Sequence, residues 1–278
     1  MPTATFPRGR GMMVIWGEVQ HGSIDEEALN EWWTYEHLPE RLAIPGFRRA
    51  RRYYSVENAK SQYLVCYEVS SMDIFTSPAY MDALNNPTFA TQTYMPLMAS
   101  MNRLVCHVAQ SCSRPEFGEC SGAGTGATLV LITFQPPASQ NLRDELGSWI
   151  AERLWPSLSS HQSLVAIHLL RYDSYASQSG SSTKSYEKVN FQSAATGAGP
   201  ERWVILVELA ESITAPFAKH QVLTHSIVHQ LRRYAGEIES QAFGLICALS
   251  EIENSVTRHK LEVSRPKETG PVLERSRL

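Results

Sequence analysis

The stretch WWTYEHLPERLAIPGFRRARRYY, which spans Trp32–Tyr54, decides how the chain is expected to fold. Apolar side chains recur at helical spacing up to Trp33, which indicates an amphipathic helix. Pro39 disfavours helical geometry at Leu38, so the helix is predicted to end there. The run that begins at Phe47 is rich in residues that favour strands, and a strand is predicted to follow the turn.

His37 falls in the last turn of this predicted helix. The partial negative charge at a helix C-terminus favours imidazolium, and two carboxylates, Glu36 and Glu40, lie close in sequence. A histidine in that setting is suited to titrate near neutral pH and to move protons. The alternative is a helix-capping or partly buried histidine without chemistry.

The first half of the chain has the element order β-α-β-β-α-β, the ferredoxin-like arrangement. Its first helix is predicted to begin at a capping box formed by Ser23 and Glu26. Two further helices are expected near Pro78–Leu84 and up to Ala99. The predicted strands are Gly11–Gln20, Phe47–Val56, Ser61–Ser70 and Arg103–Ser111.

The same order begins again after a segment rich in Gly and Ser. The predicted units are residues 1–112, a linker at 113–126, a second unit at 127–253 and a tail at 254–278. Helices are expected at Asn141–Leu154 and Ile213–Ala235, and a flexible excursion at Ser174–Pro200. The predicted strands of this half are Thr128–Phe134, Leu164–Tyr172, Arg202–Ala210 and Gln241–Ile252.

Matching motifs in the two halves indicate a tandem duplication. Trp33-x-x-Glu36-His37-Leu38-Pro39 resembles Trp149-x-x-Glu152-Arg153-Leu154, although Pro156 stands one residue later than the match requires. Arg52-Tyr53 resembles Arg171-Tyr172, and Glu68 occupies the same motif position as Glu208. Both faces of each predicted sheet are apolar, so each sheet needs a second sheet as cover. The sequence therefore predicts an α+β fold, in which two tandem ferredoxin-like units form an α/β barrel with helices outside. Because Arg153 stands where the first half has His37, a single site is expected, in the first half.

Composition excludes several classes of partner. The formal net charge is −3, with mixed signs along the chain, so neither nucleic acid nor a membrane is an expected partner. No apolar run approaches about 18 residues, and the N-terminus lacks the core of a signal peptide. The five cysteines show no metal-like spacing, and a cytoplasmic location is expected.

The stretch Trp32–Phe47, followed by Arg51-Arg52-Tyr53, resembles the dimeric α/β-barrel superfamily, most of all its EthD-like branch and its duplicated members from fungal natural-product pathways. Ser77-Pro78-Ala79-Tyr80 and Asn86-Pro87-Thr88 add to the resemblance, which covers about Gly11–Ser111 well. The resemblance implies a ferredoxin-like barrel, often a homodimer, with a cavity between sheet and helices. It also implies cofactor-free cyclases, isomerases, dehydratases, decarboxylases or quinone-forming oxygenases, and it carries the family's histidine over onto His37.

The candidate catalytic residues are His37 as proton shuttle, Glu18 to orient it or share its proton, and Arg52 to hold a planar anion. The bland alternatives are a rim carboxylate for Glu18 and a strand-surface charge for Arg52. Candidates for substrate binding are aromatic or polar residues that could pack against a flat ligand or form hydrogen bonds with it: Trp16, Trp33, Tyr53, Tyr67, Tyr94 and His107. Each of these is also a plausible core or core-edge side chain. His225 and His229 have i, i+4 spacing, but no acidic partner is matched to them, and no metal site is predicted.

These features predict a cofactor-independent isomerase or cyclase that acts by acid/base catalysis on a small aromatic or polyketide-derived substrate. Three alternatives stay open: a dehydratase or decarboxylase for the same substrates, a quinone-forming or haem-linked oxygenase, and a non-catalytic ligand-binding barrel. The fold hosts many activities, so the choice among reactions rests on the resemblance. The sequence defines neither the substrate nor the oligomeric state.

Overall fold

The computed structural model describes residues 9–19, 25–57, 60–98, 100–114, 125–189, 191, 201–214 and 219–251. The predicted tail after 253 lies outside these residues, as do Ser23 and most of the predicted linker. Among the described residues, no helix is both long and apolar enough to cross a membrane.

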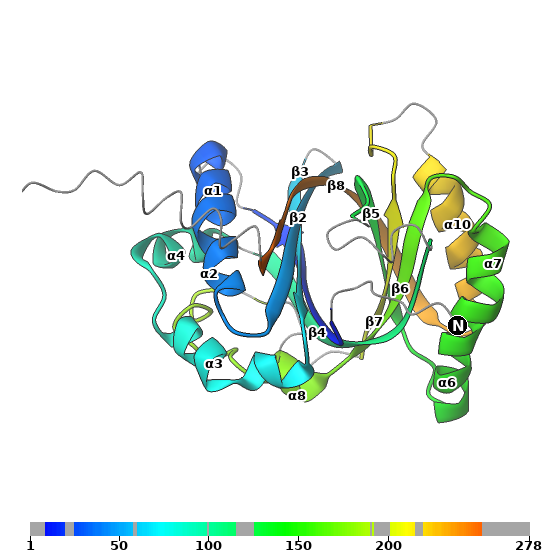
Figure 1. Ribbon diagram of the computed structural model, residues 1–278, viewed down its shortest axis with the longest axis horizontal. Helices are drawn as coiled ribbons and strands as arrows, with labels where there is room; N and C mark the ends of the chain where they lie inside the picture. Colours follow the sequence, from blue (N-terminus) through cyan, green and yellow to red (C-terminus); the bar gives the residue numbers. More distant parts are fainter. Residues whose placement is uncertain are drawn as a thin grey trace, which may run out of the picture.

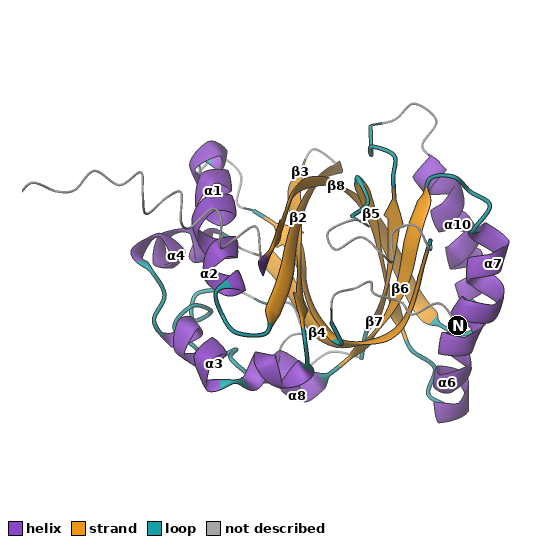
Figure 2. Cartoon of the chain, in the orientation of Figure 1, coloured by secondary structure: helices purple, strands orange, loops and turns teal. Residues whose placement is uncertain are grey.

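Eight antiparallel strands close into one barrel, which confirms the predicted α+β barrel (Figure 2). Around the barrel the order is β1-β3-β2-β8-β5-β7-β6-β4. The first half supplies β1 (Gly11–Glu18), β2 (Phe47–Glu57), β3 (Lys60–Val69) and β4 (Ser100–Ser113). The second half supplies β5 (Thr128–Gln135), β6 (Leu164–Tyr172), β7 (Trp203–Leu209) and β8 (Gly236–Ser250). The pairs β2–β8 and β4–β6 join the halves, so a single chain closes the barrel.

The helices lie outside the barrel, on two opposite flanks (Figure 1). One flank carries α1 (Glu26–Trp32), α2 (Leu38–Leu42), α3 (Pro78–Asn85) and α4 (Phe89–Tyr94), with 3-10 turns at Met72–Thr76 and Met95–Leu97. The other carries α6 (Gln140–Trp149), α7 (Trp155–Leu158) and α10 (Lys219–Leu231). The short α8 (Ser174–Gln178) belongs to the second half by sequence but lies beneath the first.

The first helix does not end at Leu38, because a π-helix at Trp33–His37 carries it onward into α2. The N–H of Leu38 bonds to the carbonyl of Trp33, which ends the wide turn, and Pro39 then occupies the start of α2, where no N–H is needed. The helix begins at Asp25, whose side chain accepts bonds from two backbone N–H groups. The second half has the same arrangement: a π-helix at Ile150–Leu154 continues into α7, which contains Pro156.

The element starts of the two halves align with a different shift from the one that the sequence motifs indicate. β1 and β5, the two π-helices, and β2 and β6 each begin 117 positions apart, at residues 11 and 128, 33 and 150, and 47 and 164. With this shift Pro156 corresponds to Pro39, and the counterpart of His37 is the buried Leu154 rather than Arg153. The same shift pairs Arg51 with His168, not Arg52 with Arg171.

Both faces of β1 are buried along most of its length, as predicted. Met12 and Val14 on β1 belong to the apolar cluster inside the barrel. Met13 and Ile15, the alternate residues, pack under the helices. The run of arginines on β2 divides in the same way, which places Arg51 inside the barrel.

A buried charge network occupies the barrel interior. Arg51 forms ion pairs with Glu68 at 3.0 Å and with Glu208 of the second half, and all three side chains are fully buried. Arg49 adds two hydrogen bonds to Glu68, at 3.0 and 2.8 Å, and His168 lies 3.5 Å from Glu208. Burial alone would raise the pKa of Glu208, but the nearby Arg51 and His168 lower it to about 2.

The predicted flexible excursion at Ser174–Pro200 is, in its described part, an ordered segment packed on the first half. We call residues 174–189 and 191 the crossing segment. The hydroxyl of Ser177 accepts a bond from the N–H of Val105 at 2.9 Å, and the N–H of Ser185 donates to the carbonyl of Leu84 at 3.0 Å. Phe191 forms a parallel bridge with Met101. These bonds hold the segment against β4 and α3.

We expect Arg51→Met to destabilise the fold strongly, because it leaves two buried carboxylates with fewer cationic partners. The expected loss in the free energy of unfolding is about 3–5 kcal/mol, measured by denaturant titration. The control is Arg48→Met, whose guanidinium is half exposed and pairs with the exposed Glu251; it should change stability by less than about 1 kcal/mol. Equal effects of the two variants would contradict the importance of the network.

Candidate functional site

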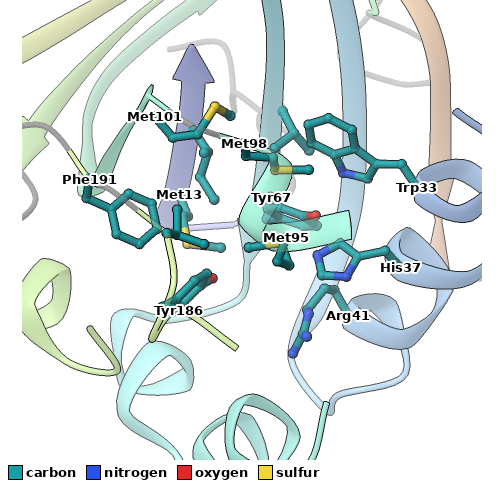
Figure 3. Close-up of a pocket in the computed structure, with 13 residues that line it drawn as sticks. Met13, Trp33, His37, Arg41, Tyr67, Met95, Met98, Met101, Tyr186 and Phe191 are labelled. Carbon is teal, nitrogen blue, oxygen red and sulfur yellow. The ribbon is translucent and has the colours of Figure 1, made fainter. Parts of the chain in front are cut away.

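A cavity lies between the outer face of β1, β3 and β4 and the helices of the first half (Figure 3). The cavity volume is about 20 Å³, room for about one water molecule, so a larger ligand would have to displace the flexible methionine side chains of its wall. Most of its wall is apolar and rich in methionine, and the polar exceptions are few: His37, Arg41, Tyr67 and Tyr186. The apolar lining consists of Met13, Ile15, Trp33, Val65, Met95, Met98, Met101, Val189 and Phe191.

His37 reaches the cavity from the last position of the π-helix. A π-turn is wider than an α-turn and is frequent at functional sites, because it redirects the side chains that follow it. The imidazole is 8% exposed, its ring centroid lies 4.9 Å from that of Trp32, and its Nδ1 has no hydrogen-bond partner among the described residues. Burial and the neighbouring Arg41 hold the pKa of His37 well below its usual value. The group is therefore a neutral imidazole near pH 7, able to accept a proton.

Arg41 follows His37 by four residues, so the two side chains lie on the same helix face. Figure 3 shows them side by side at one end of the cavity. The guanidinium is 3% exposed, and its Nη1 has no hydrogen-bond partner in the described part of the chain. The cavity thus combines a neutral base with a buried cation.

Two tyrosines supply the remaining polar groups. Burial raises the pKa of Tyr67 and of Tyr186 above the usual range, although the charge of Arg41 opposes the rise at both. Both phenols are therefore neutral at pH 7 and can donate hydrogen bonds to a ligand. Tyr186 also packs against Arg103, whose guanidinium lies 5.5 Å from the ring centroid.

The crossing segment closes the cavity. Tyr186, Val189 and Phe191 all come from the second half of the chain, whereas the rest of the lining comes from the first. The rings of Tyr186 and Phe191 pack edge-on with centroids 5.1 Å apart. The site in the first half therefore depends on the second half for one wall.

Three of the predicted site residues meet in this cavity: His37, Trp33 and Tyr67. Arg52 lies on the same side of the sheet but is engaged elsewhere. Its guanidinium donates to the side chain and the backbone carbonyl of Asn30, and it stacks 5.1 Å from the ring centroid of Trp33. Arg52 supports the wall of the cavity without lining it.

The other predicted residues are dispersed. Tyr53 is inside the barrel and accepts a bond from Arg51 at 3.1 Å. Trp16 lines a separate opening at the barrel mouth, and Glu18, two positions later, shares that strand face. Tyr94 stacks on Trp32 with centroids 5.2 Å apart. His107 is 41% exposed and pairs with Asp173 at 3.0 Å, beyond the cavity.

Sequence reasoning missed two contributors to the site. Arg41 could have been found, because its i+4 spacing from His37 is visible in the sequence. Tyr186 could not, because no local pattern shows that the excursion crosses to the other half. In the second half, the residue 117 positions after His37 is the buried Leu154, which carries no titratable group.

His225 lies apart from this cavity, in an open groove between α10 and β8. Across the described residues, no group of three His, Cys, Asp or Glu side chains is arranged to hold a metal ion.

Comparison with known proteins supports the fold. No protein-family model and no curated protein matches the chain by sequence. Among solved structures, it is similar to an anthrone oxidase-like protein, with TM-score 0.52 and 11% identity over 88% of this chain and 94% of that chain. It is also similar to a candidate monooxygenase from Fusobacterium nucleatum, with TM-score 0.50 and 8% identity over 87% of this chain and 95% of that one. At these sequence identities the similarity shows only that the fold is shared. It does not show that the chain belongs to the EthD-like branch.

Because the pKa of His37 is lowered in the folded protein, the free energy of unfolding is expected to depend on pH. Below about pH 6.5 the unfolded chain gains a proton at this histidine that the folded chain does not bind, so the free energy of unfolding decreases as pH falls. We expect His37→Gln to remove part of this decrease. Its melting temperature should fall less than that of the wild type between about pH 7 and pH 5. The matched control is His161→Gln, at an exposed position; a wild-type slope in both variants would contradict the prediction.

Proposed function

We propose that the protein is a small-molecule enzyme that uses His37 for proton transfer, and that it isomerises or cyclises a flat, largely apolar substrate without a cofactor. The observation that carries the proposal is a neutral, buried imidazole in a largely apolar cavity, with an Nδ1 that has no partner among the described residues. A base with a depressed pKa is unprotonated at neutral pH and is ready to accept a proton.

In the proposed reaction, His37 removes a proton from a carbon next to a carbonyl group and returns it at another atom. Negative charge develops on the oxygen during this step, and neutral donors such as Tyr67 stabilise it by hydrogen bonding. The methionine and tryptophan wall excludes water, which strengthens these interactions. Loss of water or carbon dioxide from the same substrates would need the same groups, so a lyase is the nearest alternative.

A second candidate is the oxidation of a phenolic substrate by molecular oxygen. The similarity to the anthrone oxidase-like protein and to the candidate monooxygenase favours it. Both reactions begin with removal of a proton, and they differ in the fate of the resulting anion. Oxygen consumption separates them, and a visible absorption band of the purified protein would point to a haem-linked form.

The proposal also includes the origin of the two halves. The shared element order, the two π-helices and the constant shift of 117 positions favour a tandem duplication after which only the first copy kept the histidine. The motif around His37 favours a relationship with the EthD-like branch.

The test uses anthrone, a probe that reports on both candidates. A base that removes its benzylic proton exchanges that position with solvent deuterium, which NMR in D2O detects, and oxidation would consume oxygen. We expect His37→Gln to lower the exchange rate by about 10²- to 10⁴-fold, the usual contribution of a general base. The melting temperature near neutral pH should stay within a few degrees of the wild type.

The control is His161→Gln, which should exchange anthrone at the wild-type rate. Equal rates in wild type and His37→Gln would contradict the role of His37. Tight binding of anthrone without exchange or oxygen uptake would favour a ligand-binding barrel instead.

A further inference from the structure

We propose that Arg41 is an anion-binding residue, and that the cavity takes a small planar molecule that carries an ionised oxygen, as a phenolate, an enolate or a carboxylate. The inference rests on the proposed function, because it names the class of molecule that the same cavity would bind. It also reassigns the anion-holding role that the sequence placed on Arg52.

Arg41 stands apart from the other buried arginines. Arg49 and Arg51 are paired with carboxylates, Arg52 bonds to Asn30, and Arg103 donates to the carbonyl of Ser177 at 2.5 Å. Arg41 forms no ion pair with any carboxylate in the described ranges, and its buried Nη1 has no partner. A buried cation without a counter-charge is costly, which favours a ligand that supplies the charge.

In the part of the chain that the structure describes, the groups around Arg41 do not supply that charge. Its charge acts on His37, Tyr67 and Tyr186, and each of these is neutral at pH 7. The rest of the cavity wall carries no charged side chain. Residues 192–200, which follow the crossing segment, contain no acidic side chain.

The geometry also sets where the anion would lie relative to the base. His37 and Arg41 project from one helix face and are adjacent in Figure 3. An oxygen held by Arg41 would bring the carbon next to it toward the imidazole. Tyr67 and Tyr186 also line the cavity, and their neutral phenols can donate hydrogen bonds to a ligand there. A guanidinium is well suited to such planar anions because it is planar and always charged.

The test uses para-nitrophenol, because its phenolate is coloured and its ionisation can be read by absorption while it is bound. We expect the wild-type protein to bind the phenolate preferentially and to lower the apparent pKa of the bound dye. Arg41→Met should abolish this shift and weaken binding of the phenolate about 10- to 100-fold, the effect of losing one charged hydrogen bond. Arg48→Met, which removes an exposed arginine, should behave like the wild type.

Two further measurements separate the outcomes. Competition by benzoate and by its uncharged analogue benzamide tests whether a carboxylate is accepted and whether charge is required. Arg41→Lys should keep part of the preference for the phenolate, whereas a merely structural role would make it behave like Arg41→Met. The inference would be overturned if Arg41→Met, folded by its melting curve, still bound the phenolate like the wild type. The proposed function would survive that result if His37→Gln still lost exchange of anthrone.

Discussion

Arg51 provides the interaction on which the rest of the structure depends. It extends from β2 in the first half and binds Glu68 of the same half and Glu208 of the second. These charges lie in the barrel interior. Removing them from water costs free energy, and the ion pairs with their partners offset that cost. The network thus links the halves at a fixed register, and the apolar residues around it complete the interior.

Because the interior is filled, the space for a ligand lies outside the sheet. The strands of the first half present a second apolar face there, and the helices cover it incompletely. The π-helix sets the direction of His37, and the following turn sets that of Arg41. The result is an imidazole and a guanidinium at one end of a largely apolar cavity, whose other polar groups are the phenols of Tyr67 and Tyr186.

Much of the fold followed from the sequence, because alternating apolar residues and turn signals mark strands well. All eight strands lie within a few residues of their predicted positions. The predicted helix ends near Pro39 and Pro156 were wrong, because the spacing of apolar residues does not reveal that a π-helix carries each helix past its proline. Of the residues that line the cavity, His37, Trp33 and Tyr67 were among the predicted candidates. Glu18 shares a strand face with Trp16 and so points away from the cavity.

The closure of the barrel has a consequence for how the chain acquires its structure during synthesis. β2 and β4 are the two edges of the first half: each pairs on one side with a strand of that half, and on the other side with β8 and β6 respectively. Until those strands leave the ribosome, both edges offer unpaired backbone groups, which is the condition under which nascent chains pair with one another. Since β8 is the last strand in the described part of the chain, the barrel closes only when nearly all of that part has emerged. The cavity wall supplied by Tyr186 likewise forms late, so a nascent first half would hold His37 and Arg41 in an incomplete, solvent-accessible site.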